Sequence, residues 1–417
     1  MSSTPFAPPV PTSPAVARRV LASGWLTWGA AVEGAVDYWR GALRRGATPL
    51  DIAGDVSRWW EATAVRREPT WASPNRVVMA SDLARLRDFD PECTDPVVPT
   101  LLFPPQAGHS SCIVDYSREQ SQVKTARAAG LTRLYSLDWV GATDATKHAS
   151  ITDYLRFAEA AIEHIGGPVN LVGDCQGGWL ATIYAALHPE HVHTLTIAGA
   201  PIDFHAGAGA INDYVRLLSP ADMRFYEEVI RLGDGVLKGA FMLNGFITIK
   251  PENEIAKHLQ LLNHIRDEEH VARHRAFEDW FKHTQDIPGD FYLWIVERLF
   301  RDNALVRGEL EIDGRRVDLA AIRCPVNLLA GATDHITPPA QVFALAGAVS
   351  TPPEDIVQRV TGGGHLGLFM GREALRDHWP PIFAAVQARS RRAPSPAATP
   401  RRARAVTPAD RDAIPAP

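Results

Sequence analysis

The sequence predicts an α/β fold in which a mostly parallel sheet carries helices on both faces. Short apolar runs typical of buried strands alternate with helical patterns from residue 97 onward. One of these runs, Val169–Val172, passes through a glycine-rich turn directly into an apolar helix. The alternation stops between residues 204 and 300 and then resumes. These observations indicate one α/β core that is interrupted by a helical insertion.

The composition is that of an ordinary globular protein. Of the 417 residues, 46% are hydrophobic and 22% are charged. The formal net charge of −5 gives no reason to expect nucleic-acid binding. Four scattered cysteines form no CxxC pair, so we expect no metal site, no disulfide framework and a reducing, cytoplasmic compartment. No apolar run approaches the ~18 residues of a membrane helix.

The segment before residue 97 is expected to comprise a disordered lead, residues 1–14, and a helical extension, residues 15–96. The lead is rich in Pro, Ser and Thr and lacks the basic and apolar regions of a signal peptide. The extension holds six of the eleven tryptophans, several of them at helical spacing. We favour the interpretation that this aromatic stripe docks the N-terminal helices on the catalytic domain. The alternative is an interfacial surface for a lipid-like or polymer phase.

Residues 97–203 are predicted to form the first half of the core. Strands are expected over Val97–Phe103, Arg133–Leu137 and Thr194–Ala198, and a helix over Ile151–Ile165. Because the carboxyl ends of parallel strands share one edge of the sheet, we expect ligands to gather at the loops that follow these strands.

Residues 204–300 are predicted to form a helical cap, because amphipathic helical patterns follow one another there without a strand. We expect this cap to cover the carboxyl edge and to leave a mainly apolar tunnel beneath it. Residues 301–388 resume the core after a hairpin that turns at Asp313-Gly314. Residues 389–417 are expected to be a disordered basic tail.

Cys175 lies at the apex of the glycine-rich turn, with Gly173 and Gly177 two residues away on either side. A side chain on a strained strand-to-helix turn crowds these neighbours, so both must be very small. The positive end of the following helix favours the reactive thiolate form. A buried structural cysteine is the alternative, but such a residue needs no glycines around it. The pattern is that of the nucleophile elbow of α/β-hydrolases, with Cys in place of Ser.

Two further residues complete a candidate catalytic triad. Asp334 follows one predicted core strand, and His365 follows the next in a glycine-rich loop. Nucleophile, acid and histidine stand in the chain order of α/β-hydrolases, and all three are expected to converge at one edge of the sheet. We expect His335 to be a supporting residue that points the other way. Three histidines are expected to be surface residues at the opposite edge: His188, His191 and His193.

Two backbone segments are expected to stabilise an oxyanion. The N–H of Gln176 directly follows the nucleophile and points where an oxyanion would form. The loop after the first core strand, with Gln106, Ala107 and Gly108, is expected to supply the second N–H.

The elbow G-D-C-Q-G-G resembles the G-x-C-x-G-G box of polyhydroxyalkanoate synthases, closest to the short two-subunit kind. The resemblance extends over about residues 97–387. Its further motifs are Asn303-x-Leu305-x-x-Gly308-x-Leu310, Gly314-x-x-Val317-Asp318-Leu319, Asp334-His335-Ile336-x-Pro338 and Gly364-His365-Leu366-Gly367. Two other segments look more like the intracellular polyhydroxyalkanoate depolymerases, namely Pro105–His109 and Gly199–Asp203.

The resemblance implies a thiol enzyme with Cys175 as nucleophile, His365 as base and Asp334 as the partner of the histidine. Its implied substrate is an (R)-3-hydroxyacyl-CoA, with the CoA thioester consumed as substrate and no bound cofactor. The implied partners are the polymer or its granule and a second subunit, or a second copy of the chain. We favour the synthase over the depolymerase. When a thiolate attacks a CoA thioester, the enzyme thioester that forms has nearly the same energy, so a cysteine is well matched to synthesis from thioesters. A non-catalytic granule-associated protein is a third interpretation, which the complete triad argues against.

Overall fold

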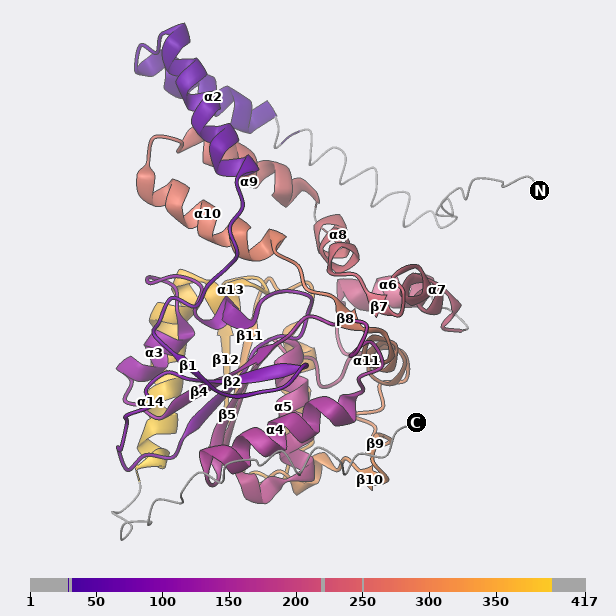
Figure 1. The fold of residues 1–417 in the computed structure, drawn as a ribbon. Helices are drawn as coiled ribbons and strands as arrows, with labels where there is room; N and C mark the ends of the chain where they lie inside the picture. Colours follow the sequence, from indigo (N-terminus) through magenta and orange to yellow (C-terminus); the bar gives the residue numbers. More distant parts are fainter. Residues whose placement is uncertain (1–28, 30–31, 219–221, 250, 392–417) are drawn as a thin grey trace, which may run out of the picture.

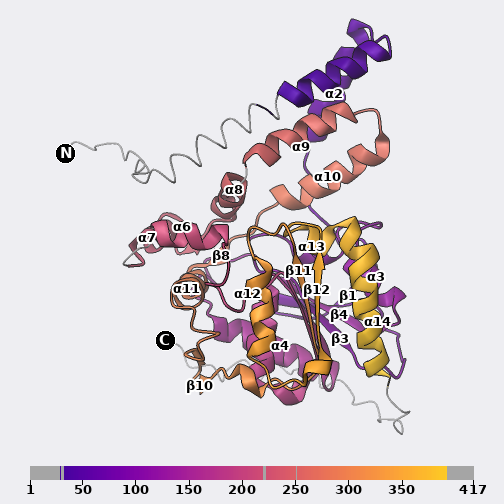
Figure 2. The ribbon, with the colours of Figure 1, turned by 180° about the vertical axis from the view of Figure 1, so that it is seen from behind.

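The computed structural model describes residues 29, 32–218, 222–249 and 251–391. The expectations for the lead, residues 1–14, and for nearly all of the basic tail lie outside the described residues. Figures 1 and 2 show a central sheet with helices on both faces, and a group of further helices above one end of the sheet.

An eight-stranded sheet forms the core in the order β1-β2-β4-β3-β5-β6-β11-β12. The six strands from β4 to β12 pair in parallel, whereas β1 and β2 are antiparallel. The strands are β1 (Arg76–Ala80), β2 (Ala84–Asp88), β3 (Thr100–Phe103), β4 (Leu134–Trp139), β5 (Val169–Asp174), β6 (Val192–Ala198), β11 (Val326–Gly331) and β12 (Ile356–Thr361). The predicted fold class, a mostly parallel α/β sheet, is confirmed.

Both faces of the central strands are buried. Leu101 and Leu171 point into one apolar cluster, and Leu102 and Val172 point into the other. Helices α4 (Ile151–Ile165), α5 (Gln176–Leu187) and α12 (Pro339–Phe343) contribute to the first cluster; α3 (Gln122–Ala128), α13 (Gly367–Met370) and α14 (Trp379–Ser390) contribute to the second. Because successive residues of a strand face opposite sides, this burial explains the continuous apolar runs of the core strands.

The core begins earlier than the sequence indicates. Residues 76–88 were expected within the helical extension, but they form the antiparallel strands β1 and β2 at one edge of the sheet. In β2 the apolar Ala84 and Leu86 are buried and alternate with two arginines. Each strand has only five residues, so the alternation in β2 is too short to distinguish it from the surrounding sequence. Pairing with β4 therefore decides the conformation of this segment.

The cap lies between β6 and β11, above the carboxyl ends of the parallel strands (Figures 1 and 2). Its helices are α6 (Ala210–Leu218), α7 (Arg224–Leu232), α8 (Gly239–Ile249), α9 (Pro251–Asn263), α10 (Glu268–Lys282) and α11 (Gly289–Trp294), which continues as a π-helix over Ile295–Arg301. The sequence patterns did not indicate α8. This helix is apolar nearly all round and contains two glycines, so it lacks the 3.6-residue polar period.

Two short antiparallel pairs accompany these elements. In the cap, β7 (Val236–Leu237) pairs with β8 (Ile287–Pro288). After the cap, β9 (Glu311–Ile312) pairs with β10 (Arg315–Arg316), and both turn residues between them have positive φ: 49° at Asp313 and 74° at Gly314. The predicted Asp-Gly hairpin is confirmed.

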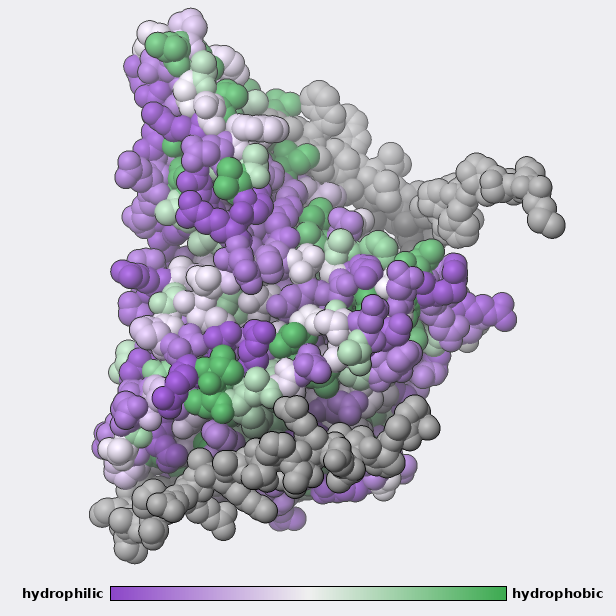
Figure 3. Space-filling model, in the orientation of Figure 1, coloured by the Kyte–Doolittle hydropathy of each residue, from purple (hydrophilic) through white to green (hydrophobic). Residues whose placement is uncertain are grey.

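The N-terminal helices are residues 32–44 and α2 (Pro49–Ala64), and α2 packs on the cap helices α9 and α10. Trp59 donates a hydrogen bond to the carbonyl of His258 on α9 (3.0 Å). Trp39 and Trp60 are 51% and 66% exposed, and hydrophobic surface is visible at this end of the molecule (Figure 3). Of the described tryptophans before residue 72, Trp59 packs on the cap, Trp71 packs against Phe89 of the core, and the other two are exposed. Trp25 and Trp28 lie outside the described residues. No helix of the described residues has the length and apolar character needed to cross a bilayer.

Candidate active site

Cys175 joins β5 to α5 in a strained backbone conformation, with φ 51° and ψ −121°. A Cβ atom on Gly173 would lie 2.5 Å from the Cα of Gly178, and one on Gly177 would collide with the carbonyl oxygen of Phe103. The glycines are therefore required by close backbone approach on both sides of the turn. The strain holds the thiol out at the carboxyl edge of the sheet.

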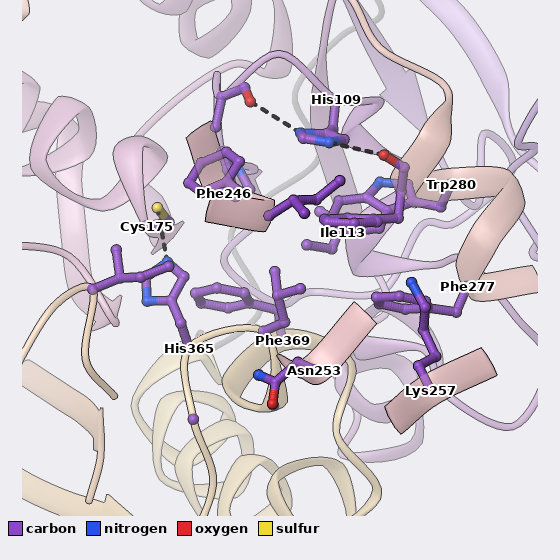
Figure 4. Close-up of a pocket in the computed structure, with 18 of the residues that line it drawn as sticks. His109, Ile113, Cys175, Phe246, Asn253, Lys257, Phe277, Trp280, His365 and Phe369 are labelled. Atoms are coloured by element: carbon purple, nitrogen blue, oxygen red, sulfur yellow. Dashed lines mark hydrogen bonds between the residues drawn. The ribbon is translucent and has the colours of Figure 1, made fainter. Parts of the chain in front are cut away.

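The structure brings Cys175, His365 and Asp334 together (Figure 4 shows the first two). His365 Nε2 lies 3.1 Å from the Sγ of Cys175, and His365 Nδ1 lies 2.7 Å from Asp334 Oδ2. The other carboxylate oxygen of Asp334 accepts hydrogen bonds from the backbone N–H groups of Ile336 and Thr337, each at 2.9 Å. Asp334 is thus fixed by the loop after β11, and it fixes the histidine ring in turn.

The electrostatics of the cluster favour a charged pair. Burial alone would lower the pKa of His365, but the negative charges of Cys175 and Asp334 outweigh it and raise the pKa to about 10. At neutral pH the imidazole is therefore protonated. A protonated imidazole next to a cysteine favours the reactive thiolate form of the thiol. A thiolate–imidazolium pair of this kind is ready to attack a carbonyl without a prior proton transfer.

A second acidic side chain lies directly beside the nucleophile in the chain. Asp174 is fully buried, and the nearest donor is the side-chain amide of Gln122 at 3.4 Å. Burial raises the pKa of Asp174 to about 8, with Gln122 and the positive charge of His365 opposing the rise. Asp174 is therefore largely uncharged at neutral pH and does not compete with Asp334 for the imidazolium.

The loop residues Gln106, Ala107 and Gly108 have three different environments. The side chain of Gln106 is buried and donates to the hydroxyl of Tyr154 (3.0 Å). Ala107 lines the cavity that contains Cys175 and His365. Gly108 has a φ of 75°, and its carbonyl accepts a hydrogen bond from the N–H of Gln285 in the cap (2.8 Å).

These environments narrow the candidates for an oxyanion site. Gln176 is the first residue of α5, so no carbonyl of the helix can reach its N–H. Ala107 is the member of this loop trio that lines the cavity beside Cys175, whereas Gln106 is bound to Tyr154 and Gly108 to the cap. The N–H groups of Gln176 and Ala107 therefore stay candidates for the oxyanion site.

His109 was not singled out as a site residue, yet it joins this loop to the cap. Its ring stacks on Trp280 and Phe281 of α10, with ring centroids 5.0 and 5.6 Å away. Its Nδ1 lies 3.0 Å from the carbonyl oxygen of Ala107, and its Nε2 lies 3.1 Å from that of Phe281 (Figure 4). The only sequence signal was its place next to Gly108. The histidine holds Ala107 against the cap.

A cavity of about 350 Å³ opens beside Cys175 and His365. Its walls are mostly apolar and come from both the core and the cap, including Ile113, Phe246, Phe277, Trp280 and Phe369 (Figure 4). Glu254 and Lys257 also line it, and they form an ion pair at 2.6 Å. His335 also lines the cavity. The space suits an acyl group more than a charged ligand.

Two groups of side chains in the described residues lie at ligand distance from one another. His188, Glu190 and His191 form one, at the connection from α5 to β6 and so at the edge opposite Cys175. Glu254, His258 and Glu278 form the other, but Lys257 makes ion pairs with both glutamates. Neither group contains a member of the Cys175 cluster.

Comparison with known proteins gives a family match and similar chains. The family described as "Protein of unknown function (DUF3141)" matches residues 78–378. The chain is 25% identical to the poly(3-hydroxyalkanoate) polymerase subunit PhaC of Haloferax mediterranei, over 80% of this chain and 71% of that one. It is 26% identical to the subunit of the same name from Allochromatium vinosum, over 75% of this chain and 88% of that one. The resemblance to polyhydroxyalkanoate synthases is confirmed.

Among solved structures, a thermophilic esterase from Thermogutta terrifontis aligns with a TM-score of 0.43 and 16% identity, covering 77% of this chain and 100% of that one. The strand order, the strained elbow and the helices on both faces are themselves those of an α/β-hydrolase.

Proposed function

The chain belongs to the family described as "Protein of unknown function (DUF3141)", and we propose that it is a synthase-like acyltransferase acting on 3-hydroxyacyl thioesters. The observation that carries this proposal is the contact of Cys175 with His365, and of His365 with Asp334, beside a mostly apolar cavity. The similarity to polymerase subunits supports the choice of substrate class.

In the first step, the thiolate of Cys175 attacks the carbonyl carbon of an acyl-CoA. The tetrahedral oxyanion accepts hydrogen bonds from the N–H groups of Gln176 and Ala107. The bond from the carbonyl carbon to the CoA sulfur then breaks, and CoA leaves with the proton of His365. One thioester replaces another, so this step exchanges bonds of nearly equal energy.

In the second step, neutral His365 takes the proton from the hydroxyl of another hydroxyacyl group as its oxygen attacks the acyl-Cys175 thioester. A carbon–oxygen ester bond forms, the carbon–sulfur bond breaks, and the thiolate–imidazolium pair is restored. Asp334 keeps Nε2 of the histidine directed at the reacting atoms throughout.

Hydrolysis of the polymer is the second candidate function. The loop Pro105–His109 and the segment Gly199–Asp203 favour it, because both are similar to segments of the intracellular depolymerases. The same residues would serve, with water in place of the second hydroxyl. We also propose that the chain works with a partner subunit at the polymer surface, since the relatives are named as polymerase subunits.

The test is to incubate the protein with (R)-3-hydroxybutyryl-CoA and, separately, with amorphous polymer, and to measure free CoA and released acid. A synthase releases CoA and forms polymer; a depolymerase releases acid from the polymer. Mass spectrometry of the quenched protein should find the acyl group on Cys175. Cys324→Ala is the matched control, because Cys324 lies outside the cavity and its replacement should leave the labelling intact. Labelling at another residue would contradict the proposal.

A further inference from the structure

A second cavity, of about 400 Å³, lies within the cap. Phe246 of α8 lines both this cavity and the one beside Cys175, so it stands at the boundary between them. The walls of the second cavity come from α6, α7, α8 and the segment from α11 into the π-helix, and they include Val215, Tyr226, Phe241 and Tyr292. None of the steps described above uses this space.

Gln176 links the second cavity to the catalytic residues. This residue directly follows the nucleophile, and its side chain lines the second cavity and not the first. Its Oε1 atom is buried and has no hydrogen-bond partner among the described residues. A buried acceptor without a donor is unfavourable, so this oxygen is suited to a donor brought in by a ligand.

The chemistry of the walls restricts the ligand. Every residue that lines the second cavity is uncharged at neutral pH, and most are aromatic or aliphatic. A phosphate or carboxylate would be buried there without a counter-charge, which is strongly unfavourable. An alkyl chain with one hydroxyl close to the reacting carbonyl satisfies both the apolar walls and the amide oxygen.

The size indicates the length of that chain. A cavity of ~150 Å³ is large enough for benzene, so 400 Å³ can hold a chain on the order of ten carbon atoms. A four-carbon acyl group would leave most of the space empty.

We propose that the cap cavity is the acyl-chain site, and that the side-chain amide of Gln176 accepts a hydrogen bond from the 3-hydroxyl of the chain. The preferred substrate is therefore a 3-hydroxyacyl thioester of medium chain length. This inference rests on the proposed function. It assigns the cavity beside Cys175 to the second reactant, and Phe246 to the boundary between the two.

The experiment measures ligand binding, so it does not depend on turnover. Isothermal titration of the Cys175→Ala protein with (R)-3-hydroxydecanoyl-CoA, decanoyl-CoA and (R)-3-hydroxybutyryl-CoA separates the effects of chain length and hydroxyl. We expect the hydroxydecanoyl thioester to bind at least tenfold more tightly than the hydroxybutyryl thioester, and several-fold more tightly than decanoyl-CoA. Equal affinities for the long and short thioesters would overturn the assignment.

Two further substitutions locate the site. Gly245 lines the second cavity, and a Cβ atom there meets no other atom within 4 Å, so Gly245→Phe should fill the space without a backbone clash. It should remove the preference for the long chain, whereas the matched change Gly54→Phe on α2, also in open space, should not. Gln176→Leu should abolish the advantage of the hydroxyl and keep the preference for length. If Gly245→Phe retains the chain-length preference, the cavity is not the acyl site.

The outcomes separate the two proposals. If wild-type protein forms acyl-Cys175 but Cys175→Ala binds long and short thioesters equally, the function holds and the acyl-site assignment fails. If no thioester labels Cys175 but free (R)-3-hydroxydecanoate binds and Gly245→Phe prevents it, the acyl site holds and the synthase proposal fails. If neither the thioesters nor the free acid binds, the acyl-site assignment fails.

Discussion

Two buried carboxylates of this molecule, Asp334 and Asp55, have different roles. Asp334 is held by two backbone N–H groups and by His365, a partner that can lose its proton. Asp55 on α2, at the junction of the N-terminal helices with the cap, is held by Tyr38, Arg45 and Arg266, and both arginines stay charged at any physiological pH. The first arrangement can pass a proton, and the second can only hold two elements together. The comparison shows that the partner of a buried carboxylate, more than its burial, indicates whether the carboxylate takes part in proton transfer.

The largest effect should come from the nucleophile. Cys175→Ala removes the sulfur that contacts His365, so turnover should fall by at least ~10³-fold. Circular dichroism should show an unchanged fold, since the substitution only shortens one side chain. Cys175→Ser should also lose most of the activity, because a hydroxyl has a far higher pKa than a thiol. Full activity in the alanine variant with either thioester or polymer would remove Cys175 from the mechanism.

The next effect should divide the roles of the other two residues. Asp334→Asn leaves the histidine without its anionic partner, so deprotonation of the second nucleophile should slow by about 10²- to 10⁴-fold. The first step should slow less, so acyl-enzyme should accumulate. His365→Ala should slow both steps. Rapid-quench labelling with a radiolabelled acyl-CoA measures this, and an Asn variant that turns over while never building up labelled protein would show that the division of roles is wrong.

The structural carboxylate should affect stability instead of rate. Asp55→Leu removes the carboxylate that accepts from the buried Tyr38 hydroxyl and pairs with Arg45 and Arg266, of which Arg266 keeps Asp51 as a second partner. The arginines are partly exposed and can regain water, so we expect the free energy of unfolding to fall by about 2 kcal/mol. Glu61→Ala is the control, because its ion pair with Arg275 is largely exposed and should contribute less than about 1 kcal/mol. Denaturant unfolding measures both, and equal losses would mean that Asp55 is not a special contact.

A further effect should be a change in the pH dependence of stability. The pKa of Asp174 rises from 3.8 to about 8 in the folded protein, so between these values the unfolded chain is ionised while the folded chain keeps its proton. The folded state then binds more protons, and its contribution to stability falls as the pH rises across this range. Asp174→Asn should remove that decline, so the Tm advantage of the variant should grow from pH 5 to pH 8. The change Asp144→Asn at an exposed position is the control for the loss of one carboxylate.

The sequence by itself determined the features that local backbone chemistry enforces. Glycines at 173 and 177 are required by atoms a few residues away or in the adjoining strand, so the elbow is readable from its spacing. The Asp313-Gly314 turn is readable for the same reason, since both residues must adopt positive φ. The strand-by-strand order of Cys175, Asp334 and His365 follows from the topology of a parallel sheet, whose carboxyl ends share one edge.

Only the tertiary structure decided the features that depend on distant partners. Residues 76–88 are strands because β4 offers an edge, and α8 is a helix because the cap surrounds its apolar surface. Trp59 packs on α9 because of a contact with His258, 199 residues away in the chain. The same holds for the place of His109 between the loop and the cap, and for the hydrogen bond from Gln106 to Tyr154. The spacing of residues along the chain determines local backbone conformation. The contact partner of a side chain depends instead on which surfaces meet when the chain folds.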